Sequence, residues 1–254
     1  MVRSGKNIYV RAAEFDASGL NMGRKIRWSE QDNGRGSFSP NYSQYNVIYV
    51  PDNYGKVSFS KVELRHIFIS MLAMIAIFAL AFRGMGNSYF SNYWTQLLFL
   101  LGIAAGAVVL GFLLHELGHK FMAQRYGAWA EFRMYPMGLI LGFVTAMIGF
   151  IFVAPGAVYI QGNITKKQNG LISLAGPITN IAIGSIFLIG WLLVGSGPVA
   201  YALFLLATMN LYLAVFNLIP IPPLDGEKIL RWNVPVYVLT MATAIGLLAY
   251  AWFF

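Results

Sequence analysis

The chain contains no cysteine among its 254 residues. This absence excludes disulfide bonds, zinc sites with thiolate ligands and a cysteine nucleophile. A metal ion would therefore have to be held by histidine or carboxylate side chains. Charged residues are also scarce, at 11% of the chain, whereas soluble domains carry roughly a quarter. Hydrophobic residues make up 57% of the chain in several long runs, so we expect a multi-pass membrane protein.

Acidic residues are fewer than basic ones, which leaves a formal net charge of +8. The basic residues lie among mixed charges near the N-terminus and at the ends of apolar segments, and they form no continuous stripe. We therefore expect them to face solvent and lipid headgroups, and we expect no nucleic-acid partner. The first residues lack the apolar core of a signal peptide, so the first membrane segment should remain in the mature protein.

The chain divides into two predicted parts. Residues 1–62 form a small polar head, accessory or partly disordered, with β-like runs at 7–10, 46–50 and 56–60. Residues 63–254 form a membrane-embedded part. Its apolar segments predict about five transmembrane helices, over residues 67–82, 95–122, 171–194, 199–219 and 236–253. The predicted fold class is thus an all-α polytopic membrane protein with a polar N-terminal segment.

The apolar stretch 134–155, between the second and third helices, is interrupted by glycine and proline. Residues 1–66 hold 10 of the 18 Lys and Arg residues, so we expect the N-terminus to be cytoplasmic. If 134–155 crossed the membrane, Lys166 and Lys167 would lie outside. If it enters and returns, they lie inside together with Lys228 and Arg231. We therefore predict a re-entrant region, covered by protein or by a wet cavity.

The second predicted helix carries the sequence His115-Glu116-Leu117-Gly118-His119 near its C-terminal end. Residues four apart lie on one face of a helix, so both imidazoles can reach a single metal ion. Glu116 lies beside them, where a carboxylate can accept a proton from water at the metal. The alternative is a polar cluster that only binds neighbouring helices through hydrogen bonds. Two histidines and a glutamate are costly to bury in hydrocarbon without a function, which favours the metal site.

A catalytic zinc site takes three protein ligands and leaves one position open. His66 is the remaining histidine, but it lies on a polar flank beside Arg65. Glu131 and Glu227 are possible ligands in basic surroundings. Asp225 follows three prolines that end the fourth predicted helix, and the re-entrant topology brings it to the depth of the histidines. We therefore expect Asp225, rather than a simple turn aspartate, to be the third ligand.

The motif at 115–119, followed by Asn217-x-x-Pro-x-x-Pro-Leu-Asp225-Gly226, resembles the site-2 protease family of intramembrane zinc metalloproteases (peptidase family M50). The resemblance covers residues 64–232, and residues 175–180 resemble a glycine- and asparagine-containing stretch of the family. It implies one zinc ion held by His115, His119 and Asp225, with Glu116 as general base and acid. It also implies that Asn217 holds the substrate strand or the oxyanion, and that 134–160 is a membrane-reentrant β region.

The resemblance predicts a zinc-dependent endopeptidase that cuts transmembrane proteins in or near their membrane segments. Its partners would be those substrates and the lipid bilayer. The distribution of Lys and Arg residues predicts that the active site opens toward the cytoplasm of a cell membrane. A metal transporter is an alternative, although such a protein would need polar residues along a path through the whole bilayer. A catalytically inactive relative that binds membrane proteins is another alternative.

Overall fold

The computed structural model describes residues 10–15, 21–26, 57–82, 90–150 and 152–253. The chain divides into two compact units, Met1–Tyr54 and Gly55–Phe254. In the first unit β1, Val10–Phe15, pairs antiparallel with β2, Asn21–Ile26. The predicted run 7–10 meets β1 only at its last residue, and the run 46–50 lies outside the described residues. An accessory role for the polar head stays a prediction.

The predicted β-like run at 56–60 is wrong for the residues that the structure describes. Residues 57–60 have no regular secondary structure and lead into α1, Lys61–Phe82. The hydroxyl of Ser60 accepts a hydrogen bond from the backbone N–H of Glu63 at 3.1 Å. This is the bond that a helix N-cap serine makes, so Ser60 starts α1 and does not continue a strand.

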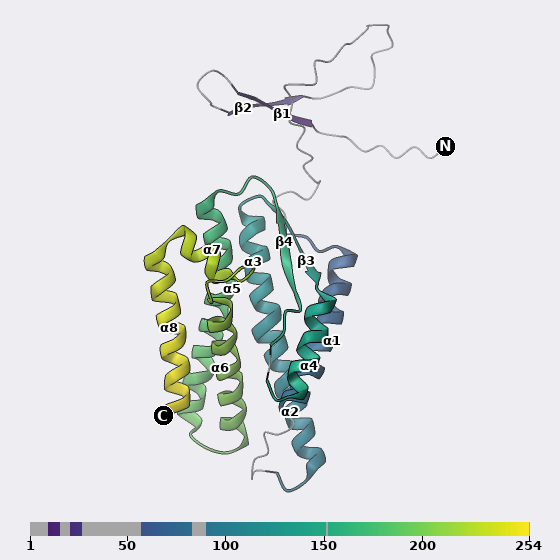
Figure 1. The fold of residues 1–254 in the computed structure, drawn as a ribbon, viewed down its shortest axis with the longest axis vertical. Coiled ribbons are helices and arrows are strands. Elements are labelled where there is room, and N and C mark those ends of the chain that lie inside the picture. Colours follow the sequence, from purple (N-terminus) through teal and green to yellow (C-terminus); the bar gives the residue numbers. More distant parts are fainter. Residues whose placement is uncertain (1–9, 16–20, 27–56, 83–89, 151, 254) are drawn as a thin grey trace, which may run out of the picture. The chain divides into compact units, whose positions relative to one another are not determined.

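The second unit is a bundle of long helices with a hairpin on one side (Figure 1). After α1 follow α2, a π-helical segment and α3, then the hairpin strands β3 and β4 with α4 between them, and finally α5 to α8. Their bounds are α2 Tyr93–Ala107, the π-helical segment Val108–Leu113, α3 Leu114–Arg125, β3 Trp129–Met134, α4 Pro136–Met147, β4 Gly156–Gln161, α5 Lys166–Val194, α6 Pro198–Asn217, α7 Asp225–Trp232 and α8 Val234–Phe253.

Five helices in the described part of the chain are long and apolar enough to cross a membrane. They are Lys61–Phe82, Tyr93–Arg125, Lys166–Val194, Pro198–Asn217 and Val234–Phe253, and they coincide with the five predicted segments. The protein is therefore a multi-pass membrane protein, as its composition predicts. The continuous helix Tyr93–Arg125 contains the π-helical segment just before the first metal-motif histidine. Such π-helical turns occur frequently at functional sites.

The described residues between the second and third spans contain no helix long enough to cross a membrane. Helix α4 in this region has 12 residues, which corresponds to about 18 Å, whereas the hydrocarbon core is roughly 30 Å thick. Strands β3 and β4 pair antiparallel, from Trp129 opposite Gln161 to Met134 opposite Gly156. The expected β-like region is thus a hairpin whose connection contains a short helix. Pro136 starts that helix, at a position where its missing N–H costs nothing.

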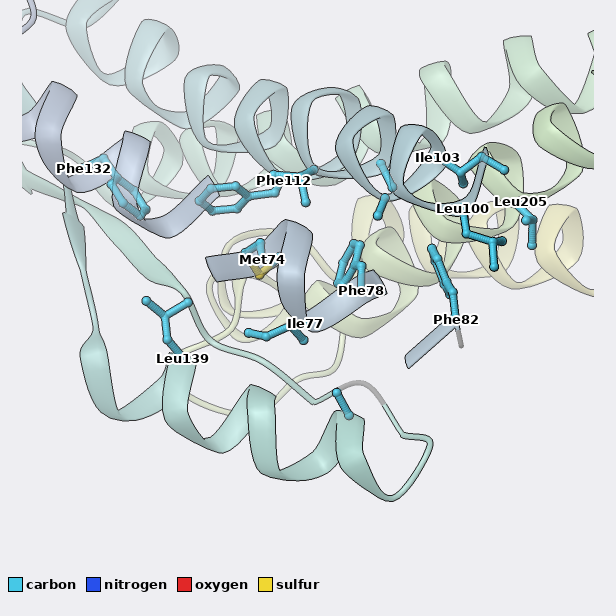
Figure 2. Close-up of a cluster of buried hydrophobic side chains, with 14 residues drawn as sticks. Met74, Ile77, Phe78, Phe82, Leu100, Ile103, Phe112, Phe132, Leu139 and Leu205 are labelled. Atoms are coloured by element: carbon cyan, nitrogen blue, oxygen red, sulfur yellow. The ribbon is translucent and has the colours of Figure 1, made fainter. Parts of the chain in front are cut away.

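The largest apolar core joins α1 to the metal-motif helix and to the hairpin (Figure 2). Met74, Ile77 and Phe78 of α1 are almost fully buried, and Phe112 and Phe132 pack edge to face with their ring centroids 5.6 Å apart. On the other side, α3 crosses α5 closely, since a Cβ on Gly118 would lie 3.1 Å from the Ala175 carbonyl oxygen. The motif helix is therefore held from both sides by packing.

Candidate metal centre

Helix α3 presents His115, Glu116 and His119 toward the N-terminus of α7, where Asp225 is the first helical residue. His115, His119 and Asp225 are buried, and their nearest ligand atoms all lie within 4.8 Å of one another. They form the one group of three or more potential metal-binding side chains among the described residues. The structure thus brings together the three residues that the sequence predicts as ligands.

The three ligand atoms have the spacing that a zinc ion requires. The Nε2 atoms of His115 and His119 are 3.0 Å apart, and Oδ2 of Asp225 lies 3.4 Å and 3.0 Å from them. Ligand atoms about 2.0–2.1 Å from a tetrahedral zinc ion lie about 3.3 Å from each other. The observed triangle therefore fits a zinc ion bound by all three atoms.

Each imidazole is oriented by a hydrogen bond from its other nitrogen. Nδ1 of His115 lies 2.8 Å from Oδ1 of Asn180, and Nδ1 of His119 lies 2.7 Å from the carbonyl oxygen of Ile172. Both partners are acceptors, so both Nδ1 atoms carry the proton and donate. Each neutral ring then has a lone pair on Nε2, directed into the cluster. Such lone pairs repel each other unless a cation lies between them, which again fits a metal ion.

Asn180 also connects the π-helical segment to the site. Its Nδ2 atom donates to the carbonyl oxygen of Gly111 at 3.1 Å, and the residue is fully buried in α5. Gly176, one turn earlier in α5, faces both rings: a Cβ there would lie 2.4 Å from Nε2 of His119 and 2.6 Å from Nε2 of His115. The absent side chain leaves the space that a metal ion needs.

Asp225 reaches the histidines because the chain turns sharply after α6. A Cβ on Gly226 would lie 2.0 Å from the Leu218 carbonyl oxygen, so only glycine permits this return. As a metal ligand the Asp225 side chain would be a carboxylate, because protein ligands bind a metal ion in their deprotonated form.

A cavity of about 180 Å³ opens onto the site, which is room for several water molecules. Glu116 lines it with the three ligand residues, and so does Asn217, whose Nδ2 atom donates to the Leu213 carbonyl oxygen of its own helix at 2.9 Å. Strand β4 and the segment before it form another wall, and Lys228 and Asn169 also line the space. The cavity therefore leaves room for water beside Glu116 and the metal position.

The other candidate ligands lie elsewhere. Glu131 accepts a hydrogen bond from the Ser60 hydroxyl and pairs with Arg133, and Glu227 pairs with Arg231. His66 is in the second turn of α1 and is outside the ligand group. The sequence alone does not predict that Ile172 and Asn180 orient the imidazoles. The stretch 175–180 contained a signal for Asn180, but a backbone carbonyl such as that of Ile172 leaves none.

The chain is similar to several known proteins. The profile of peptidase family M50 matches residues 192–237, which include Asn217 and Asp225. A protein of Methanocaldococcus jannaschii named "Putative zinc metalloprotease MJ0611" is 40% identical over 198 residues, which are 77% of this chain and 97% of the relative. "Zinc metalloprotease MJ0392" of the same organism is 32% identical over 67% of this chain, which spans only 41% of that relative.

A protein of Bacillus subtilis named "Putative zinc metalloprotease YwhC" is 28% identical over 56% of this chain and 75% of its own length. No solved structure matches the chain significantly. The names of these relatives and the ligand set indicate zinc as the metal. With a relative that matches along nearly its whole length, the chain belongs to peptidase family M50, the site-2 protease family of membrane-embedded zinc metalloproteases.

Proposed function

We propose that the chain is a zinc-dependent endopeptidase that cuts membrane proteins within or near their transmembrane segments. The observation that carries this proposal is the position of the ligand cluster. His115 and His119 lie in a helix long and apolar enough to span the bilayer, and the cavity beside them is bounded by a hairpin strand that does not span it. A substrate in the bilayer can therefore reach the same space as water.

In this proposal His115, His119 and Asp225 hold the zinc ion. Bound zinc supplies a Lewis acid that lowers the pKa of a water molecule toward about 7. Glu116 accepts the proton of the attacking water while a C–O bond forms at the scissile carbonyl. When the C–N bond breaks, Glu116 donates that proton to the leaving amine nitrogen. Asn217 lines the same cavity and would donate to the carbonyl oxygen or to the substrate strand.

A transmembrane helix hides its carbonyl groups in its own hydrogen bonds, so the substrate must become extended before cleavage. In the bilayer the freed backbone groups need new partners. Strand β4 pairs with β3 on one edge only, among the strands that the structure describes. An extended substrate segment would add to the other edge of β4, next to the metal.

We further propose that the N-terminus and the opening of the site face the cytoplasm of a cell membrane. Lys61 starts α1, Arg125 ends α3, Lys166 and Lys167 start α5, and Lys228 and Arg231 lie in α7. These helix ends lie at one end of the bundle, with α7 (Figure 1). Positive residues concentrate on the cytoplasmic side of membrane proteins. Water would then reach Glu116 from that side.

The test is incubation of the purified protein in detergent or liposomes with a panel of single-span proteins, with and without a zinc chelator. We expect chelator-sensitive cleavage that zinc restores, with the cut located by mass spectrometry in or beside a transmembrane segment. Zinc flux into liposomes without cleavage would favour a transporter. Substrate binding without cleavage by the zinc-loaded protein would favour an inactive relative. Either result would contradict the proposal.

A further inference from the structure

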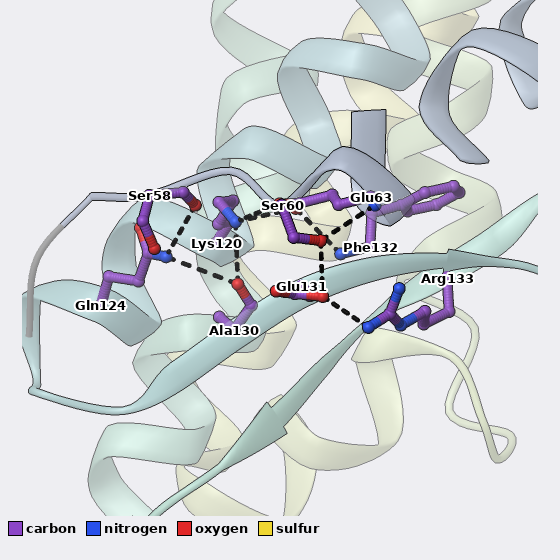
Figure 3. A network of polar contacts seen from close by, with 9 residues as sticks. All are labelled: Ser58, Ser60, Glu63, Lys120, Gln124, Ala130, Glu131, Phe132 and Arg133. Carbon is purple, nitrogen blue, oxygen red and sulfur yellow. Dashed lines mark hydrogen bonds and ion pairs between the residues drawn. The ribbon is translucent and has the colours of Figure 1, made fainter. Parts of the chain in front are cut away.

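A buried ion pair lies one residue beyond the second histidine (Figure 3). Lys120 of α3 is 1% exposed and Glu63 of α1 is 0% exposed. The Lys120 ammonium donates to both Glu63 carboxylate oxygens at 2.8 Å and to the carbonyl oxygen of Ala130 in β3, also at 2.8 Å. All three of its protons are thus used. The ring of Phe59 covers the ammonium, with its centroid 4.5 Å away.

The same pair binds a second backbone group of β3. The carboxylate of Glu63 accepts a hydrogen bond from the backbone N–H of Phe132 at 3.0 Å. The Ala130 carbonyl and the Phe132 N–H point to the same edge of the strand, because backbone groups alternate between the two edges. These are the groups to which the N–H and C=O of a neighbouring strand would bind. Lys120 and Glu63 therefore occupy the outer edge of β3 with side chains and close it to strand addition.

This geometry also determines which groups β4 offers on its other edge. Ala130 lies opposite Ile160 and Phe132 lies opposite Val158. In an antiparallel pair, opposite residues alternate between those that bond to each other and those whose backbone groups point outward. Because Ala130 and Phe132 point outward from β3, Ile160 and Val158 point outward from β4. Both of these residues line the cavity of the metal centre.

We propose that Lys120 and Glu63 are positioning residues that set which substrate bond is cut. They close the outer edge of the hairpin, so a substrate strand can add only beside Val158 and Ile160. They also fix the hairpin to the turn of α3 that carries His119, which sets the register between the substrate backbone and the metal. This inference rests on the proposed peptidase function. Burying an ion pair costs desolvation energy, and an apolar pair could replace it if stability were its only role.

The decisive variant is the double substitution Glu63→Gln with Lys120→Met. It removes both charges together, so it leaves no unpaired buried charge. It also removes one of the two donors to the Ala130 carbonyl, which keeps only the longer hydrogen bond from the Gln124 amide, at 3.4 Å. We expect zinc content and melting temperature close to those of the parent protein. For a transmembrane substrate we expect kcat to fall at least tenfold with a smaller change in KM. Mass spectrometry should detect cuts at several neighbouring bonds in place of the parent's position.

Lys167→Met is the matched control, because Lys167 is an exposed lysine in the first turn of α5. It should cut where the parent cuts, with the parent's kcat. If the double variant does not fold, Lys120→Arg serves the same test, since it keeps the charge but changes the shape of the donor. A folded, zinc-loaded variant of either kind that cuts the same bond at the parent's kcat would overturn the inference alone. A parent protein that cuts no membrane substrate would overturn the proposed function, and this inference with it.

Discussion

Gly176 lies so close to both imidazole rings that no side chain would fit at this position. The carboxylate and the rings define the metal position, but this glycine in α5 keeps it open, and Asn180 and the Ile172 carbonyl orient the rings. Gly176, Asn180 and Ile172 of α5 do not bind the metal themselves, but they determine whether the histidines can bind it. Partners of this kind typically change metal affinity 10- to 100-fold when they are removed.

Gly176→Ala should therefore weaken zinc binding while the protein still folds. The new methyl carbon would lie 2.4–2.6 Å from both Nε2 atoms, so at least one ring must move away from the metal position. We expect a loss of at least about tenfold in zinc affinity, measured by competition with a chelator. Gly190→Ala in the same helix is the matched control, because its Cβ would be 3.5 Å from Leu203, an ordinary contact. Equal zinc affinity of the two variants would contradict this role.

Sequence reasoning reaches part of this site. His115, Glu116 and His119 follow from helical spacing alone, because i and i+4 share a face. Asp225 needs the additional step that 134–155 does not cross the membrane, since only that topology brings it to the same depth. The Ile172 carbonyl could not be predicted, because a backbone group carries no residue-type signal. The role of Asn217 stays a prediction, although its side chain lines the cavity.

Among the elements, the hairpin with α4 differs most from its sequence pattern. Glycine and proline within 134–155 indicate a non-spanning stretch, but they do not predict the 12-residue helix that it contains. The glycines Gly138 and Gly142 read as helix breakers, whereas in the fold they allow the return segment to pack on α4. A Cβ on Gly138 would lie 2.0 Å from the Ala154 carbonyl oxygen, and one on Gly142 would lie 2.6 Å from Val153. Close packing here overrides helix propensity.

Gly138→Ala should separate α4 from the segment that leads into β4. Overpacking of this kind costs about 1–3 kcal/mol, and here the obstacle is a backbone carbonyl that cannot rotate away. We expect a lower melting temperature in detergent and faster protease cleavage between α4 and β4. Gly102→Ala in α2 is the control, since a Cβ there meets nothing within 4 Å. A Gly138→Ala protein as stable and as protease-resistant as this control would show that the contact is not needed.

At the scale of the whole molecule, the five spans alternate in direction. The histidines near the end of the second span and Asp225 after the fourth span would therefore lie toward the same membrane face. The five spans follow from apolar length, which is the strongest sequence signal in a membrane protein. The polar head illustrates the opposite case. Its strands β1 and β2 lie mostly outside the predicted β-like runs, because short polar strands have only a weak alternation pattern.

The absence of cysteine makes this topology directly testable. Single cysteines at Lys61, Lys167 and Arg231, all exposed, should react with a membrane-impermeant maleimide from the same side of the membrane. Cysteines at Tyr93 and Val199, which are 69% and 62% exposed, should react from the opposite side. Labelling of right-side-out and inside-out vesicles distinguishes the two. Reaction of Lys61→Cys and Lys167→Cys from different sides would mean that 134–155 crosses the membrane after all.

The central claim is that Glu116 acts as the general base and acid of a zinc peptidase and is not one of its metal ligands. The most direct measurement compares zinc content and cleavage of one transmembrane substrate by the parent protein and by Glu116→Gln. Glutamine keeps the size of the side chain but cannot accept the proton of water. We predict one zinc ion per chain in both proteins, with cleavage lowered by at least about a hundredfold in the variant, the lower end of what one general acid or base contributes. Parent-like cleavage by the zinc-loaded variant would contradict the account.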